Sequence, residues 1–101
     1  MSIILALDLG TTGNRAIAFN KKAEIVAQSY YEFEQHFPEP AWVEHDPIEI
    51  WDTAQKALKD VLDQVGVENV VSMGITNQRE TTILWDKTTG KPVYNAIVWQ
   101  C

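Results

Sequence analysis

The 101-residue sequence is poor in cysteine, in clustered positive charge and in long apolar runs. Its single cysteine, Cys101, has no partner for an internal disulfide, which favours a reducing compartment such as the cytoplasm. The largest basic cluster is the pair Lys21-Lys22 and the net charge is −6, so neither nucleic acid nor an anionic membrane is expected as a partner. No stretch approaches the about 20 apolar residues of a membrane helix. The composition therefore predicts a cytoplasmic protein with no nucleic acid and no membrane among its partners.

The apolar content is high enough for a folded core. Hydrophobic residues make up 46% of the chain, four of them tryptophan, which argues against disorder. The length allows one domain at most. The sequence stops directly after the apolar, strand-like run Ala96–Trp99, whereas natural domains usually end in exposed polar segments. We therefore expect residues 1–101 to be a piece of a longer polypeptide.

Three strands are predicted in the first third of the chain. Met1–Leu9 contains a continuous apolar run, the pattern of a strand buried on both faces. A turn at Gly10–Gly13 separates it from a second strand, Asn14–Phe19. Glu24–Phe33 is rich in β-branched and aromatic residues and is expected to be the third strand. The short connections favour an antiparallel meander.

One long helix is predicted after the loop His36–Asp46. Asp46 is suited to the N-cap, Pro47 to the first helical position, and Glu49 completes a capping-box-like pattern. Gly66 stands where a left-handed C-terminal cap is needed. The apolar face expected from the helical period consists of Trp51, Ala54, Leu58, Val61, Leu62 and Val65.

The last third of the chain is predicted to return to β-structure. Val70–Thr76 has the pattern of a further buried strand. Thr81–Trp85 and Pro92–Tyr94 flank a polar turn, as in a hairpin, and Ala96–Trp99 is expected to be the final strand. This order of elements predicts a mixed α/β sheet.

A carboxylate and a threonine-rich turn follow the first predicted strand. Asp8 comes after an apolar run, where a charge needs a cation or hydrogen bonds, and Mg²⁺ is one such cation. In the Gly-Thr-Thr-Gly turn, Thr11 and Thr12 offer N–H and hydroxyl donors to phosphate, and Arg15 adds a charged donor. The alternative is an ordinary hairpin turn whose polar side chains satisfy its own backbone.

A cation and an anion are adjacent after the predicted strand Val70–Thr76. Arg79 can donate to the hydroxyls of a polyol while Glu80 accepts from them. The alternative is a solvated ion pair on a loop, and Trp99 can be either a core residue or a ligand platform. His36 and His45 have no metal-ligand spacing and are expected at the surface.

Four stretches together resemble a known family. Asp8–Thr12 is similar to the first phosphate motif of the actin-like ATPase superfamily. Trp42–Pro47, Gly74–Thr82 and Tyr94–Cys101 resemble the N-terminal part of the FGGY carbohydrate kinases, and among them the members that phosphorylate glycerol. The resemblance implies a ribonuclease H-like, actin-like ATPase α/β fold. The chain would be the N-terminal part of its first lobe, with a three-stranded antiparallel meander, a helix and further strands.

The resemblance also implies roles for matching residues. ATP phosphates would be contacted by Thr11, Thr12, Gly13 and Arg15, and Asp8 would serve Mg²⁺. Glycerol would be held by Arg79 and Glu80 through its hydroxyls and by Trp99 through its carbon backbone. The chain departs from the family pattern at Leu9, Gly13 and Asn14, where the family often has Gln, Ser or Thr. Gly13 would lose a hydroxyl contact to phosphate and keep its N–H.

Two alternatives to a glycerol-phosphorylating enzyme remain open. One is a kinase of the same family that acts on another polyol or sugar. The other is a module that binds nucleotide or a partner without catalysis. In the family the general base lies far beyond residue 101, so the chain is expected to contain no catalytic base and to be inactive alone. Whether the parent enzyme is a homo-oligomer is left open.

Overall fold

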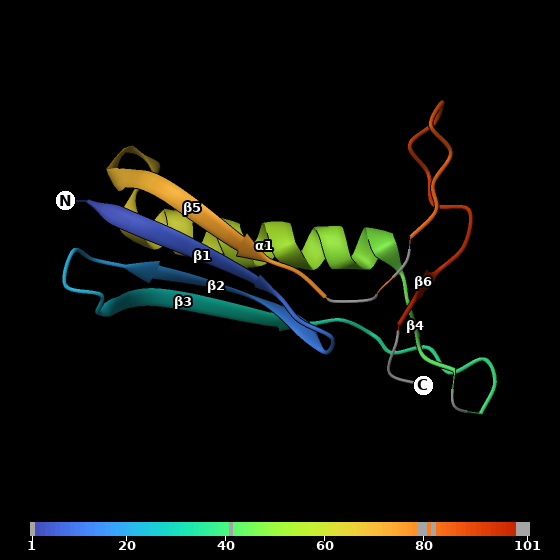
Figure 1. Cartoon of the computed structure of the whole chain (residues 1–101). Coiled ribbons are helices and arrows are strands. Elements are labelled where there is room, and N and C mark those ends of the chain that lie inside the picture. Colours follow the sequence, from blue (N-terminus) through green and yellow to red (C-terminus); the bar gives the residue numbers. More distant parts are fainter. Residues whose placement is uncertain (1, 41, 79–80, 82, 99–101) are drawn as a thin grey trace.

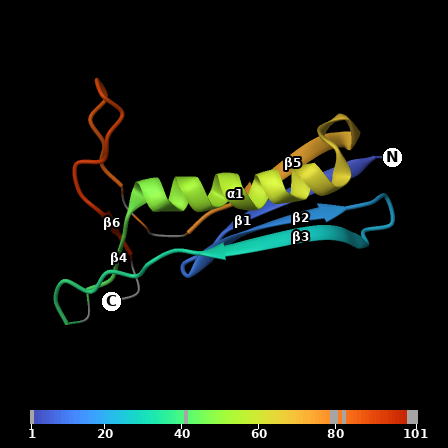
Figure 2. The same cartoon turned by 180° about the vertical axis from the view of Figure 1, so that it is seen from behind.

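A computed structural model describes residues 2–40, 42–78, 81 and 83–98 and shows a four-stranded sheet with one long helix on one face (Figure 1). The helix, which Figure 2 shows from its own side, runs along the sheet. The elements are β1 (Ile3–Leu9), β2 (Gly13–Phe19), β3 (Ile25–Glu32), β4 (Glu44–His45), α1 (Pro47–Val65), the 3-10 turn η1 (Val67–Asn69), β5 (Val70–Thr76) and β6 (Ala96–Ile97).

The strand order in the large sheet is β3-β2-β1-β5. β1 pairs antiparallel with β2, and β2 with β3, so the predicted meander is confirmed. β5 pairs parallel with β1 after the crossover through α1. The predicted loop before the helix contains β4, which pairs antiparallel with β6 in a second, two-stranded sheet. The mixed α/β class predicted from the sequence is confirmed.

The core lies between α1 and one face of the meander. Small residues from β2 and β3 oppose small residues of the helix, which lets the two layers approach closely. The buried cluster consists of Ile3, Leu5, Leu7, Ala16, Ala18, Ala27, Ala57 and Val61. A core of this kind depends on volume matching, because any added methylene has no void to enter.

Two predictions about strand burial are wrong. β1 is buried on one face only, since Ile4 is 48% exposed on the other. β5 was expected to be buried, yet Val71, Met73 and Ile75 are all exposed. The reason is the position of α1, which lies mainly over β2 and β3 and leaves β5 as an uncovered edge strand among the described residues.

The helix begins as predicted and presents most of the predicted face to the sheet, since Ala54 and Val61 are buried and three further predicted residues, Leu58, Leu62 and Val65, pack against the core. Asp46 accepts a hydrogen bond from the Ile48 N–H, and Gly66 ends the helix at a positive φ of 85°. The capping-box prediction is wrong, because the Glu49 carboxylate accepts from the Glu34 N–H instead. Trp51, placed on the apolar face by sequence, is 60% exposed. The buried helix residues are Thr53, Ala54, Ala57 and Val61. No helix in the part of the chain that the structure describes has the length and apolarity needed to cross a membrane.

Asp60 on α1 is hydrogen-bonded to β3 at the solvent-exposed edge of the interface between the helix and the sheet. Its Oδ2 accepts hydrogen bonds from Ser29 Oγ at 2.9 Å and from the Tyr31 hydroxyl. The hydrogen bond from Tyr31 is the main cause that lowers the pKa of Asp60, and the hydrogen bond to Asp60 raises the pKa of Tyr31. Both shifts favour the ionised carboxylate beside the protonated phenol.

We expect the Asp60 contact to make stability depend on pH. Because the folded-state pKa of Asp60 is depressed, its contribution is present above the unfolded pKa of about 3.9 and is lost as the pH falls through the folded pKa. Asp60→Asn should lower the urea midpoint at pH 7, and the gap to the unchanged chain should close on acidification. Asp63→Asn is the control, since the side chain of Asp63 pairs, among the described residues, only with the exposed Lys59. Equal midpoints for Asp60→Asn and Asp63→Asn at pH 7 would contradict the assignment.

Candidate functional site

The carboxyl ends of β1 and β5 meet at one edge of the sheet, because the two strands run parallel. Asp8 and Thr76 are register partners there, and Thr76 Oγ1 donates to Asp8 Oδ1 at 2.9 Å. Asp8 is exposed, which corrects the expectation of a desolvated carboxylate. Among the described residues nothing donates to its second oxygen, Oδ2. A fixed carboxylate with one free oxygen therefore marks this edge.

The turn between β1 and β2 has all its carbonyl groups engaged. The carbonyl of Gly10 accepts from Gln78 Nε2 at 2.8 Å, and that of Thr11 accepts from Gln35 Nε2 at 2.9 Å. The carbonyl of Thr12 accepts from the Phe33 N–H at 3.2 Å, and that of Gly13 accepts from the Gly10 N–H at 3.0 Å. The N–H groups of Thr11 and Thr12 donate to no group in the described part of the chain. Two free amides in a turn whose carbonyls are already bound are suited to an anion.

Charged and hydroxylated side chains continue this surface onto β2 and β3. Thr12 is exposed, and its Oγ1 lies 3.0 Å from the Tyr30 hydroxyl. Arg15 pairs across the ladder with both Asp8 and Tyr30, and its guanidinium carbon lies 4.6 Å from the centre of the Tyr30 ring. The structure thus brings Asp8, Thr12 and Arg15 to one face of the sheet, opposite the face that α1 covers.

Gly13 occupies a crowded position at the start of β2. A Cβ atom built there would lie 2.6 Å from the Tyr30 hydroxyl and 2.6 Å from the Tyr31 carbonyl oxygen. Neither contact is sterically possible, and the second involves backbone. A side chain at position 13 would therefore require β3 to shift.

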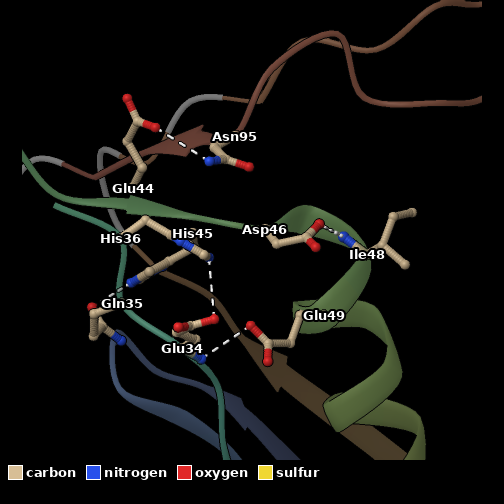
Figure 3. A network of polar contacts seen from close by, with 9 residues as sticks. All are labelled: Glu34, Gln35, His36, Glu44, His45, Asp46, Ile48, Glu49 and Asn95. Atoms are coloured by element: carbon tan, nitrogen blue, oxygen red, sulfur yellow. Dashed lines mark hydrogen bonds and ion pairs between the residues drawn. The ribbon is translucent and has the colours of Figure 1, made fainter. Parts of the chain in front are cut away.

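His45 is fully buried, which corrects its predicted surface position. Its ring packs edge-on against Phe33 at 4.6 Å, and its Nε2 lies 2.7 Å from Gln35 Oε1. Burial is the main cause that lowers the pKa of His45, and a weaker interaction with Gln78 opposes it. Gln35 and Gln78 are also the two side chains that donate to carbonyls of the turn, so His45 interacts with both of them. Figure 3 shows the ring beside Gln35.

A polar network joins the second sheet to the start of α1 (Figure 3). Glu49 Oε1 accepts from the Glu34 N–H at 3.0 Å, and His36 Nε2 lies 3.9 Å from a Glu34 oxygen. Glu44 is 3% exposed and accepts from Asn95 Nδ2 at 3.3 Å. Sequence patterns give no signal for these contacts, because each strand of the second sheet is only two residues long.

The residues predicted to bind a polyol, Arg79, Glu80 and Trp99, lie outside the described residues. Gln78, which precedes them, is described and lies against Gly10 through its amide. No group of three His, Cys, Asp or Glu side chains gathers into a metal site within the described ranges. Asp8 nevertheless fits Mg²⁺, since that ion binds proteins through one or two carboxylates and keeps several waters or phosphate oxygens.

The sequence matches a family model over residues 3–101, that of the N-terminal domain of the FGGY family of carbohydrate kinases. It is 54% identical over its full length to glycerol kinase 2 of Thermotoga maritima and 59% identical over 97% of its length to the glycerol kinase of Symbiobacterium thermophilum. These matches cover 21% and 20% of the two relatives, so the chain spans about a fifth of their length.

Solved structures of carbohydrate kinases also align with the chain. A Plasmodium falciparum glycerol kinase with ADP aligns with a TM-score of 0.88 at 38% identity, over 99% of this chain and 21% of that one. A ligand-bound xylulose kinase from Lactobacillus acidophilus aligns with a TM-score of 0.90 at 19% identity, over 99% of this chain and 20% of that one, and supports the fold alone. The predicted actin-like ATPase fold is confirmed by these alignments. The match over residues 3–101, in agreement with the observed meander, shows that the chain belongs to the FGGY family of carbohydrate kinases.

Proposed function

We propose that residues 1–101 form the N-terminal portion of the first domain of a cytoplasmic enzyme that transfers the γ-phosphate of ATP to glycerol. The observation that carries the proposal is the turn at residues 10–13, which has two free amides, follows the strand that contains Asp8, and accepts a hydrogen bond from Gln78 of the segment after β5. The names of its relatives support glycerol as the acceptor, since those at 54% and 59% identity are glycerol kinases.

The nucleotide half of the site consists of the turn and β2. The amides of Thr11 and Thr12, the N–H of Gly13 and the guanidinium of Arg15 would bind phosphate oxygens, with charge-assisted hydrogen bonds as the source of affinity. Asp8 would hold Mg²⁺, which neutralises phosphate charge when it is bound. Support for a nucleotide comes from the aligned Plasmodium falciparum enzyme, which was solved with ADP.

The polyol half follows β5. In the sequence, Arg79 and Glu80 come three and four residues after the end of that strand, and the strand itself ends at the sheet edge where Asp8 lies. A guanidinium donates to hydroxyls and a carboxylate accepts from them, which suits a ligand with a hydroxyl on each carbon. Trp99 would cover the carbon backbone of the ligand. Phosphoryl transfer also needs a base and a second wall around the nucleotide, so residues 1–101 alone are expected to be inactive.

The direct test is an assay of the full-length polypeptide for ATP consumption with glycerol, xylulose or gluconate as acceptor. Turnover that depends on glycerol and is much weaker with the two sugar-derived acceptors is the expected result. A clear preference for either sugar-derived acceptor would identify the alternative, another kinase of the family. Nucleotide binding without turnover on any acceptor would identify a non-catalytic module.

Arg79→Ala in the full-length polypeptide is expected to lower kcat/KM for glycerol by about 100-fold, because charged hydrogen bonds to a hydroxylated ligand are lost in a site with no replacement donor. The KM for ATP should change little. Lys87→Ala is the matched control, since it removes a cation from an exposed turn. The glycerol assignment is wrong if Arg79→Ala and Lys87→Ala leave glycerol turnover equally undiminished.

A further inference from the structure

Tyr30 contacts two of the residues proposed to bind phosphate, although it lies outside the turn. It is on β3, directly across the ladder from Arg15. Its hydroxyl reaches Thr12 Oγ1, and its ring lies under the Arg15 guanidinium. The side chain is 38% exposed, so a ligand can approach it.

The pair of hydroxyls formed by Thr12 and Tyr30 has an unused proton. Each hydroxyl carries one proton, and a single hydrogen bond of 3.0 Å joins them. Whichever group donates to the other, the accepting hydroxyl keeps its own proton. No acceptor for that proton exists among the described residues other than the pair itself. An anion placed beside the pair would therefore receive a donated hydrogen bond.

The ring of Tyr30 also orients the charge beside this pair. The Arg15 guanidinium lies over the ring face at 4.6 Å, the geometry of a cation–π contact. One of its N–H groups donates to Gln28 Oε1 at 3.3 Å. A guanidinium has five N–H groups, so several remain free to meet a phosphate. The ring thus holds the cation next to the hydroxyl pair.

The geometry at Gly13 shows where the Tyr30 hydroxyl lies within the turn. It is 2.6 Å from the point at which a Cβ of residue 13 would begin. Gly13 has no side-chain donor of its own, and the phenol hydroxyl takes the adjacent space. A hydroxyl donor is therefore present at this point of the turn, supplied by the neighbouring strand.

We propose that the Tyr30 hydroxyl binds a phosphate oxygen of the nucleotide directly, together with Thr12 and Arg15. This inference rests on the proposed function, because it assigns one more contact to the same nucleotide site. It makes Tyr30 a ligand-binding residue, and the role is separable from packing because Tyr30 lies on the sheet face away from α1.

The chain supplies a matched control in the next residue. Tyr31 also has a phenol hydroxyl, but it lies on the helix face and donates to Asp60. Tyr31→Phe removes the same atom from the opposite side of the same strand. It should reduce stability through the loss of the Asp60 contact and leave nucleotide binding unchanged.

The experiment measures Mg-ATP, Mg-ADP and adenosine binding to the full-length polypeptide by calorimetry, for the unchanged protein, Tyr30→Phe and Tyr31→Phe. We expect Tyr30→Phe to raise the Kd of ATP or ADP by about tenfold, which corresponds to one charge-assisted hydrogen bond. The Kd of adenosine should stay the same, because adenosine has no phosphate. The melting temperature of Tyr30→Phe is measured alongside, so that weaker binding is not confused with unfolding.

Each outcome decides between the two proposals. If the unchanged protein binds neither nucleotide, both the proposed function and the role of Tyr30 are wrong. If it binds nucleotide and Tyr30→Phe binds equally well, the function stands and the role of Tyr30 is overturned. An equal loss for Tyr31→Phe, or an equal loss of adenosine binding, would also overturn it, because the effect would then not come from a phosphate contact.

Discussion

Asp8→Asn in the full-length polypeptide lowers kcat by about 10²–10³-fold while the fold stays intact, if Asp8 holds the metal of the nucleotide site. The metal's stabilisation of charge is worth several kcal/mol, and each 1.4 kcal/mol corresponds to about a factor of ten in rate. Asparagine keeps the oxygen that accepts from Thr76 at 2.9 Å and loses the negative charge. The change therefore isolates the charge from the geometry.

The measurement is kcat as a function of Mg²⁺ concentration, with ATP and glycerol saturating. The Asp8→Asn enzyme should need more Mg²⁺ for half-maximal rate. Asp86→Asn is the control, because Asp86 is an exposed carboxylate that accepts from the amides of Thr88 and Thr89, as asparagine also can. A kcat for Asp8→Asn within a factor of about three of the unchanged enzyme, with the same Mg²⁺ dependence, would show that Asp8 has no role in metal binding.

Leu5→Ala is expected to lower the free energy of unfolding of the chain by about 2–5 kcal/mol, the range for removing a large side chain from a packed core. Leu5 is 3% exposed at the centre of β1, within the cluster that α1 covers. The core is small, and a total stability of about 5–15 kcal/mol is usual for a domain. The expected loss is therefore a large part of the total free energy of unfolding.

The neighbouring residue supplies the control. Ile4→Ala removes a similar side chain from the uncovered face of β1, where Ile4 is 48% exposed, and should cost about 1 kcal/mol. Urea denaturation of both variants measures the difference, provided that the slope with denaturant stays the same. Equal losses for the two variants would contradict the difference in burial between Leu5 and Ile4.

Local signals were enough to predict the meander and the ends of the helix. Asp46 and Pro47 fix where α1 begins, and Gly66 fixes where it ends, because each acts through the backbone next to it. The turn at residues 10–13 was also evident, since two glycines enclose two threonines. These features depend on residues close together in the sequence.

Hydrophobic periodicity predicted most of the covered face of α1 but wrongly included one large residue and missed a small one. The inward residues of β2 and β3 include three alanines, so the helix comes close and buries its own small residues. A pattern that weights large apolar side chains selects Trp51, which is exposed, and overlooks Ala57, which is fully buried. The size of the side chains on β2 and β3 decides which helix residues pack closest to the sheet.

Contacts between residues far apart in the sequence could not be predicted from sequence patterns either. His45 is buried because β6, some fifty residues later, pairs with β4, and neither strand is long enough to show a period. β5 is exposed because α1 packs mainly against β2 and β3. Within the candidate site, the sequence predicted Asp8, Thr11, Thr12, Gly13 and Arg15, and these stay predictions. It gave no signal for Gln35, Gln78 and Tyr30, because they contact the turn from other strands and loops.

The dependence of the turn on Gln78 has a consequence for synthesis on the ribosome. Gly10 and Gln78 are 68 residues apart, so the turn emerges long before the side chain that holds its first carbonyl. At a synthesis rate of about 5–20 residues per second, the interval is roughly 3–14 s. During that time the nascent meander carries an unfinished turn. The turn therefore gains its full set of carbonyl hydrogen bonds only after β5 and Gln78 have been synthesised.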